Sequence, residues 1–570
     1  MRFATLLALS TFLVFANCKQ WYDLWYDLGL YGAYPWQTYD SVDLVSPQLN
    51  VLQWDDRCDD RYTLLTPRGI SVPAPGPMII DAKGNLVWME KRFGEAMDLK
   101  IQNYKGEDYL TFWAGKDDGT HGRGYYYMLN SSYEIAYKIS PVGEGLEGDL
   151  HEFQLTENGT ALMTIYEIIQ VDLSAFGRKE PGWVYDGLFQ EIDIETGKLL
   201  FQWRSSDYYP VEETYNDIEK TGYKEDKAFD YFHINSIDKD TKGNYYVSSR
   251  YMHTVTCISP SGDVLWVLGG RHNDFEDLSH GAATNFSWQH HVNWHPNNTI
   301  TIFDNGSTNK DKTAEFSRGL AVSLDLEKMT ATLLSAYVNP KKILAASQGS
   351  VQILPDNGNV FVGWGHSAAY TEFTAEGEVL CDVHFGSSAF FDWGWIKSYR
   401  AFKGSWVGHP KTSPDIRMWA TKNTVFVSWN GATEVVSWKL EGSMTPVPNF
   451  SEDSKNFGAI QWMPREGFEA KFELDEDVQD YYLRVAALNS EGEVMGYTKV
   501  VDRRSGHIAD EPYLPREHSD FVPLHLLMGV CFLTTASFIA WEFRRPLLIK
   551  WERFYHRYHR IDNSNLENIA

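Results

Sequence analysis

Basic charge is scarce in this chain of 570 residues. Lysine and arginine number 51 against 77 aspartates and glutamates, which gives a formal net charge of −26. A protein that holds duplex DNA or RNA needs a basic surface, so the charge argues against nucleic acid as a partner. An acidic excess is typical of an exposed protein that must stay soluble.

Several signatures of common active sites are also missing. The chain contains no glycine-rich phosphate loop, no HExxH zinc motif and no strong context for a nucleophilic serine. We therefore expect no cofactor and no metal ion. What is abundant is aromatic: Phe, Trp and Tyr make up 15% of the residues. That abundance favours strands over helices, and the length predicts two or more globular units.

Both ends of the chain carry apolar runs. Residues 1–18 join a positive start to a short apolar core and a small-residue exit, which predicts a signal peptide. Residues 521–543 are long enough to span a bilayer, and a basic tail over 544–570 follows them. Because basic tails stay cytoplasmic, we predict a single-pass type I membrane protein with a lumenal or extracellular ectodomain. A buried core helix is the alternative.

Sequons and cysteines agree with a secretory route. Sequons for N-glycosylation occur at six positions: Asn130, Asn158, Asn285, Asn297, Asn305 and Asn449. Cys18 is expected to leave with the signal peptide, and Cys531 lies in the predicted span. Three cysteines remain, and three cannot all pair within one chain. A Cys58–Cys381 disulfide would tie the start of the ectodomain to its last repeat, while three buried free thiols are equally consistent.

A hairpin repeat organises residues 58–405. Each copy is a strand, an Asn/Asp/Gly turn and a second apolar strand. The copies open at Asp98, His151, His233, His290 and Gln348. A second phrase, a turn glycine leading into an apolar strand, alternates with them at Gly84, Gly197, Gly262 and Gly377. Two hairpins per repeat predict an all-β fold with a six-bladed β-propeller, the sixth blade coming from strands near both chain ends.

The flanking segments differ from the repeat. Residues 19–57 form an N-terminal extension. Residues 410–503 contain alternating strands, which predict a fibronectin-III or immunoglobulin-like β-sandwich, although these strands might instead complete the propeller. The polar residues 504–520, with two prolines, indicate a stalk before the predicted span.

Histidines open three of the repeats, at His151, His233 and His290. Equivalent inner-strand positions of a propeller converge on one mouth of its central channel. Asn235 lies two residues beyond His233 and so points to the same face of the strand, and turn pairing brings Arg250 level with His233. The sequence thus predicts a pocket suited to group transfer from an anionic ester, with an imidazole nucleophile and a guanidinium for the oxyanion. Three histidines can also hold zinc, although a neighbouring arginine would repel a cation.

Two long blocks resemble the arylsulfate sulfotransferase family. One is Phe232-HINSIDKDTKGNYYVSSR and the other is Trp288-QHHVNWHPNNTITIFDNG, and the chain as a whole is similar to the fungal branch over about residues 50 to 500. The resemblance implies a six-bladed propeller. It also implies transfer of sulfate from a phenolic sulfate ester to a phenol through a sulfohistidine, without a nucleotide sulfate donor.

Matched residue by residue, the resemblance gives each pocket position a role. His290 would be the nucleophile, whereas His233, Asn235 and Arg250 would hold the sulfate. His151 matches a further pocket histidine, and Ser347 falls near a family hydroxyl. The chain departs from the pattern in its C-terminal sandwich and membrane anchor. A second histidine, His291, follows His290, so a shift of one residue would change the nucleophile.

Three functions follow from these observations. The first is a membrane-tethered aryl sulfotransferase, or a relative that tailors a specialised metabolite, acting on a small aromatic, anionic ester. The second is a non-catalytic propeller that binds ligands as a surface receptor. The third is a metal-dependent hydrolase.

Overall fold

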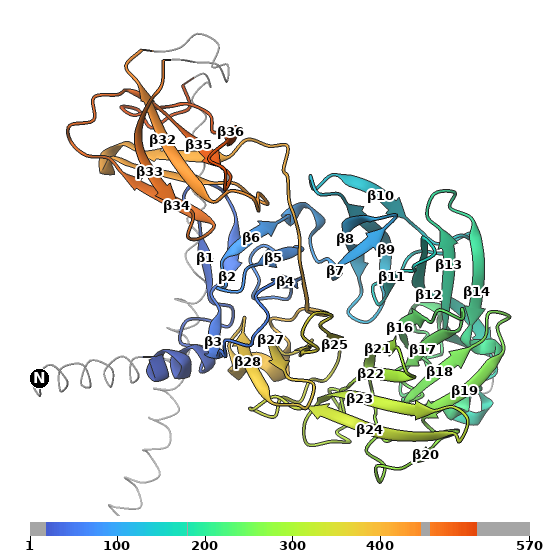
Figure 1. Ribbon diagram of the computed structural model, residues 1–570. Helices are drawn as coiled ribbons and strands as arrows, with labels where there is room; N and C mark the ends of the chain where they lie inside the picture. The colour runs from blue at the N-terminus through green and yellow to red at the C-terminus, as the bar shows by residue number, and fades with distance from the viewer. Residues whose placement is uncertain (1–18, 179–180, 446–455, 510–570) are drawn as a thin grey trace, which may run out of the picture. The chain divides into compact units, whose positions relative to one another are not determined.

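The computed structural model describes residues 19–178, 181–445 and 456–509 (Figure 1). The predicted signal peptide, the stalk beyond residue 509, the predicted span, the basic tail and Asn449 lie outside the described residues. Within the described ranges, no helix combines the length and apolar character needed to cross a membrane.

The described chain is nearly all β. Helix is confined to residues 19–27 and to short segments of 3-10 helix. These turns are η1 (Lys91–Phe93), η2 (Ser174–Phe176), η3 (Ser205–Asp207), η4 (Val211–Glu213), η5 (Glu225–Lys227), η6 (Ser388–Trp393) and η7 (Ala420–Lys422). An antiparallel pair, β1 (Trp36–Thr38) and β2 (Val45–Pro47), precedes the larger sheets.

Six antiparallel sheets follow one another between residues 50 and 404. The first contains β7 (Met97–Tyr104), β8 (Glu107–Asp117), β9 (Gly122–Leu129) and β10 (Ile135–Ile139). The second contains β11 (Phe153–Leu155), β12 (Thr160–Val171), β13 (Gly182–Asp193) and β14 (Leu199–Arg204), with β15 (Phe229–Asp230) beside β13. The third contains β16 (Ile234–Lys239), β17 (Tyr245–Ser249), β18 (Thr254–Ile258) and β19 (Val264–Gly269).

The remaining three sheets repeat this order. The fourth contains β21 (His290–His295), β22 (Thr299–Asp304), β23 (Arg318–Asp325) and β24 (Thr330–Tyr337), with β20 (Glu276–Asp277) at its edge. The fifth contains β25 (Ser350–Ile353), β26 (Val360–Gly363), β27 (Ala369–Phe373), β28 (Val379–His384) and β3 (Asn50–Gln53). The sixth contains β29 (Phe402–Gly404), β4 (Tyr62–Leu65), β5 (Met78–Ile80) and β6 (Leu86–Met89).

Neighbouring sheets contact one another in a closed cycle. β7 contacts β11, β12 contacts β16, β16 contacts β21, β21 contacts β25, β25 contacts β29, and β29 returns to β7. Figure 1 labels the strands of this cycle apart from β29. Strands near both ends of the segment close it, because β3 joins the fifth sheet and β29 completes the sixth. A disulfide between Cys58 and Cys381, the pair considered above, lies at the same junction, whereas Cys257 is a buried free thiol.

The hairpin turns explain why the repeat is visible in the sequence. In the turn between β16 and β17, one carboxylate oxygen of Asp240 accepts hydrogen bonds from the backbone N–H groups of Lys242 and Asn244. Gly243 adopts a φ of 89°, which glycine tolerates best. Asp81 and Gly84 build the same turn between β5 and β6. The Asp/Asn-to-Gly spacing is therefore the chemistry of the turn itself.

Residues 415–502 form two further sheets around a core of their own. One contains β30 (Asp415–Trp419), β31 (Thr424–Ser428) and β34 (Glu469–Glu473). The other contains β33 (Gly458–Pro464), β32 (Ser437–Ser443), β35 (Tyr482–Leu488), β36 (Val494–Tyr497) and β37 (Val501–Asp502). Val425, Trp438 and Val485 belong to the apolar cluster of this segment.

The described sequons differ in accessibility. Asn158, Asn285 and Asn297 are exposed and Asn130 is half-buried. Asn305 is fully buried, and its amide donates hydrogen bonds to the carbonyls of Ala345 and Gln348 at 3.0 Å each. A folded chain cannot present this amide nitrogen for glycosylation, so the prediction for Asn305 is corrected.

Candidate functional site

A cavity of about 360 Å³ gathers the predicted pocket residues. His151, His233, His290, Arg250 and Ser347 all line it. They come from the second, third and fourth sheets and from the connection into the fifth, far apart in the sequence. The deep wall also includes Gln348 and Tyr399, and the rim is formed by two loops around residues 216–219 and 308–311.

Irregular backbone at the start of the inner strands places these side chains. His233 precedes β16 with a φ of 55°, His291 follows His290 with a φ of 49°, and Gln348 has a φ of 65°. The pairing register also shifts between Ile234 and Ser236 and between His290 and Asn293. Such bulges redirect side chains, and left-handed non-glycine residues gather at functional sites.

The hydrogen bonds of His290 define its tautomer. Its Nδ1 lies 2.7 Å from the side-chain oxygen of Asn305. Because Asn305 donates both amide hydrogens to carbonyls, only its oxygen faces His290, so Nδ1 carries the ring proton. Nε2 is then the nitrogen with the lone pair, and it accepts a 3.2 Å hydrogen bond from the backbone N–H of Gln348.

Electrostatics keep His290 neutral. Burial lowers the pKa of His290 well below 6.5, and the positive charge of Arg250 adds to that effect. The hydrogen bond to Asn305 opposes the shift without cancelling it. A neutral imidazole with a defined free nitrogen is the form that attacks an electrophile.

His233 and His151 each have a buried carboxylate on Nδ1. Asp230 lies 2.5 Å from Nδ1 of His233, and Asp149 lies 2.5 Å from Nδ1 of His151. The two rings are 4.8 Å apart between centroids and meet edge to face. Because both carboxylates occupy the Nδ1 side, the Nε2 atoms are left for a substrate.

The charges around these two histidines differ. Burial lowers the pKa of His233 to about 4, although Asp230 opposes this shift. Burial alone would raise the pKa of Asp149, but the His151 ring and the N–H of Gly122 outweigh it and lower that pKa. His233 is therefore a neutral base near pH 7 rather than a cation.

Three cations line the cavity; Arg68 and Lys310 pair with Asp117 and Glu219, whereas Arg250 has no ion pair in the described chain. Its backbone N–H donates to the carbonyl of His233 at 2.9 Å, which brings the two residues level as the turn pairing predicted. Nη2 donates to the carbonyl of Ala346 at 2.6 Å, and the buried Nε has no hydrogen-bond partner in the described chain. A carbonyl rather than a carboxylate receives the bond, so the charge is left for an anion.

Asn235 takes a different position from the predicted one. It does not line the cavity, and its amide donates to the carbonyl of Gln289 at 2.6 Å. The strict alternation of a strand fails here because the bulge between Ile234 and Ser236 lies between His233 and Asn235. Asn235 thus holds the backbone that precedes His290 instead of facing a substrate.

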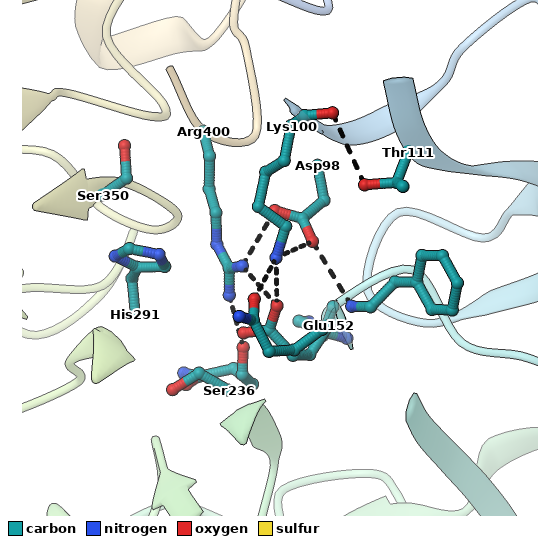
Figure 2. A network of polar contacts seen from close by, with 12 residues as sticks. Asp98, Lys100, Thr111, Glu152, Ser236, His291, Ser350 and Arg400 are labelled. Carbon is teal, nitrogen blue, oxygen red and sulfur yellow. Dashed lines mark hydrogen bonds and ion pairs between the residues drawn. The ribbon is translucent and has the colours of Figure 1, made fainter. Parts of the chain in front are cut away.

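His291 lies apart from the cavity, which separates it from His290. Its Nδ1 accepts a hydrogen bond from the backbone N–H of Val351 at 3.1 Å. Figure 2 shows His291 beside a buried cluster of Asp98, Lys100, Glu152 and Arg400. Arg400 contacts Asp98 at 2.8 Å and Glu152 at 2.9 Å, and Lys100 contacts Glu152 at 2.6 Å. These charges neutralise one another, so the cluster joins the inner strands and leaves no charge for a ligand.

Sequence reasoning missed several residues of the cavity. The hydroxyl of Tyr399 and the side-chain oxygen of Gln348 are buried there without hydrogen-bond partners in the described chain. The Tyr399 ring lies 5.7 Å from His151 and 6.5 Å from His290. The sequence contains a signal for the paired carboxylates, because Asp149 and Asp230 precede their histidines by two and three residues. It contains none for Tyr399, since no repeat phrase surrounds that residue.

One group of side chains has the composition of a metal site. His121, Asp230 and His233 offer donor atoms within 4.8 Å of one another, and all three are buried. Both imidazoles already contact Asp230, at 2.9 Å for His121 and 2.5 Å for His233. Among the described residues, His151, His233 and His290 do not bring their nitrogens together in this way.

Comparisons with known proteins add a family. A family model described as arylsulfotransferase (ASST) matches residues 100–386, and no curated protein matches the chain. A Bacteroides caccae protein of unknown function is similar at 14% identity and a TM-score of 0.35, covering 60% of this chain and 98% of its own. Virginiamycin B lyase from Staphylococcus aureus is similar at 8% identity and a TM-score of 0.30, covering 67% and 97%. Likenesses this weak carry no functional information.

Proposed function

Because the chain belongs to the arylsulfotransferase family, we propose that it moves a sulfuryl group from a phenolic sulfate ester to a phenol through a sulfated His290. The observation that carries this proposal is the state of His290. It is neutral and buried, and its proton is fixed on Nδ1. It lines a cavity together with Arg250, whose guanidinium has no ion pair in the described chain. No nucleotide donor is needed, because the aryl ester itself carries the sulfuryl group.

In the first half-reaction, Nε2 of His290 attacks sulfur. The new N–S bond forms as the S–O bond to the aryl group breaks, and the phenolate leaves. The Gln348 N–H that meets Nε2 at 3.2 Å is at the long limit of hydrogen bonding, so a bound donor can displace it. In the second half-reaction a phenol oxygen attacks sulfur and the N–S bond breaks, which restores the neutral imidazole.

Three groups would stabilise charge or transfer protons during the two half-reactions. Arg250 would hold two sulfuryl oxygens through its planar fork, where charge accumulates in the transition state. His233, neutral and held by Asp230, would take the proton of the acceptor phenol on Nε2. His151 would return a proton to the leaving phenolate, with Asp149 holding its ring. The proton that His233 takes from the acceptor would then pass to His151, whose ring centroid lies 4.8 Å away, and restore the starting state.

We also infer the larger architecture around this site. The closed cycle of six sheets supports a six-bladed β-propeller. The two sheets over residues 415–502 support the immunoglobulin or fibronectin-III assignment. The apolar run over 521–543 supports a membrane tether, with the cavity on the lumenal or extracellular side.

The test uses the full-length protein and 4-nitrophenyl sulfate. Release of 4-nitrophenolate should rise when a second phenol is added, because the acceptor clears the sulfated enzyme. His290→Gln should abolish release, while His272→Gln, at an exposed histidine that contacts Glu213, should not. Equal release by wild type and His290→Gln would contradict the proposal, and no release by the wild type would favour a binding protein.

A further inference from the structure

One side of the helix at residues 19–27 is apolar and uncovered. Trp21, Leu24 and Trp25 are 55%, 46% and 44% exposed, and Leu28 in the following turn is 57% exposed. These four positions have the i, i+3, i+4, i+7 spacing that places side chains on one side of a helix. Exposed apolar side chains normally occur singly on a soluble surface, so a contiguous row of them marks an interaction site.

The opposite side of the helix is fixed to the fifth sheet. Tyr26 is fully buried, and its hydroxyl donates a hydrogen bond to the carbonyl of Gln48 at 2.7 Å. Asp27 pairs with His384 of β28 at 2.8 Å and with Lys341. Figure 1 shows the helix beside β3 of that sheet. The apolar row therefore points outward because the other side of the helix is already packed.

The uncovered surface continues from the helix onto η6. The backbone of Gly29 lies so close to the ring of Phe390 that an added Cβ would meet it at 2.4 Å. The Phe390 ring lies 5.6 Å between centroids from the ring of Trp393, which is 62% exposed. Leu30, next to Gly29, is 66% exposed. We call this surface the Trp/Leu face, and it comprises Trp21, Leu24, Trp25, Leu28, Leu30 and Trp393.

The helix keeps its carboxylates away from the Trp/Leu face. Its two acidic residues are Asp27, buried in the ion pairs described above, and Asp23, which is half-buried. Lys19 is exposed at the start of the helix, and η6 contributes one exposed carboxylate, Asp392, beside Trp393. An exposed carboxylate would lose hydration when an apolar medium covers it. The helix side of the face, in a chain of net charge −26, is thus free of fully exposed acidic groups.

We propose that the Trp/Leu face docks onto the surface of a lipid bilayer, with its tryptophans at the level of the headgroups. Tryptophan is enriched at membrane–water interfaces because its ring is amphipathic. A helix with one apolar side lies in the plane of that interface and buries that side at the boundary of the acyl chains. The composition of the face therefore fits a lipid surface.

The chain beyond the described residues supports a bilayer as the occupant. Residues 510–520 connect the last described residue to the apolar run at 521–543. Eleven residues of extended chain reach at most about 40 Å. A bilayer spanned by this run is therefore always within reach of the ectodomain, at a high local concentration. The inference rests on the predicted span and goes beyond sulfuryl transfer, which it does not require.

The experiment uses the full-length protein in nanodiscs of phosphatidylcholine, part of which carries a photoreactive diazirine near the headgroup. After illumination, trypsin releases residues 20–57 as one peptide, because Lys19 and Arg57 flank it. We expect lipid adducts on this peptide, and fragmentation should place them within residues 21–30. Adducts on residues 521–543 without any on residues 21–30 would overturn the proposal. Failure of the protein to enter the nanodiscs would overturn it as well.

A matched pair of variants tests the face itself. Trp25→Ser combined with Leu28→Ser should lower the adduct yield on residues 20–57 by about tenfold or more, because both side chains lose their apolar contact with lipid. Leu334→Ser, at a 56% exposed position of β24, is the control and should match wild type. Equal yields in all three proteins would contradict the proposal.

Two further outcomes have defined meanings. An oligomer that forms without lipid adducts on residues 21–30, and that the double variant abolishes, would assign the face to a second copy of the chain and overturn the proposal. Lipid adducts in a protein that never turns over an aryl sulfate would support the docking surface while the proposed function fails. The labelling needs no substrate, so the two results are independent.

Discussion

The side-chain oxygen of Asn305 lies 2.7 Å from Nδ1 of His290, and two carbonyls hold the amide in that orientation. This contact places the ring proton on Nδ1, so Nε2 is the nitrogen that attacks sulfur in the proposed reaction. An asparagine whose sequon suggested a glycan thus orients the ring of His290.

Replacing Asn305 should therefore damage catalysis more than binding. In Asn305→Leu the ring is free to move its proton to Nε2, which removes the nucleophilic lone pair. We expect kcat to fall by roughly 10²- to 10⁴-fold, the range seen when a histidine loses its tautomer partner. Steady-state kinetics with 4-nitrophenyl sulfate measure this. Asn297→Gln, at an exposed sequon, is the control and should match wild type. Unchanged kcat in Asn305→Leu would contradict the assignment.

Arg250 is expected to act through its shape as well as its charge. Arg250→Lys keeps the positive charge but loses the planar fork, so kcat/KM for an aryl sulfate should fall by at least about tenfold. The matched control is Arg271→Lys, because Arg271 is exposed and donates to the carbonyl of Glu213. If both variants behave alike, Arg250 does not hold the sulfuryl oxygens.

The pH profile follows from the lowered pKa values. The active form has neutral His290 and neutral His233, and an imidazole is neutral above its pKa. Because burial lowers the pKa of His290 well below 6.5 and that of His233 to about 4, kcat/KM should stay level through pH 6.5 and fall only as the pH approaches 4. A limb near pH 6.5 in initial-rate measurements would mean that one of these imidazoles is solvated and titrates normally.

The charged cluster of Figure 2 should matter for stability. Arg400 is fully buried between Asp98 and Glu152, so Arg400→Met leaves carboxylates without their partner. We expect the free energy of unfolding to drop by about 3 kcal/mol or more. Adding Asp98→Asn should recover part of that loss, since Lys100 then balances Glu152.

The control for this prediction is an exposed ion pair. Arg57→Met breaks contacts to Asp55 and Glu378 at the surface, where solvent screens such pairs and they contribute little to stability. Urea denaturation of the full-length variants compares the two. Equal loss in Arg57→Met and Arg400→Met would show that the cluster does not hold the inner strands together.

The sequence was sufficient to predict the repeat because the turn chemistry is local. Asp240 and Gly243, or Asp81 and Gly84, build their turns from residues within four positions of each other. The pocket histidines could also be predicted from the sequence, since each opens a repeat. His233 and His290 meet in the cavity because each lies at the start of an inner strand, and the pairing of β16 with β17 brings Arg250 level with His233.

Other features depend on distant or irregular structure. The position of Asn235 depends on a bulge that breaks the two-residue period of the strand. Only the three-dimensional register distinguishes the roles of His290 and His291. Tyr399 enters the cavity from the irregular segment before β29, which the sequence does not mark. The pairing of β3 with β28 places residues 50–53 in the fifth sheet, so the closed cycle of sheets includes a strand that precedes residue 58.

The central claim is that the sulfuryl group passes through His290. The most direct measurement incubates the full-length protein with an aryl sulfate and no acceptor, then locates any added SO₃ by fragmenting the peptide that contains both His290 and His291. We expect one sulfuryl group on His290, which is lost when a phenol is added. A group on another residue, or none while phenolate is released at an enzymatic rate, would contradict it.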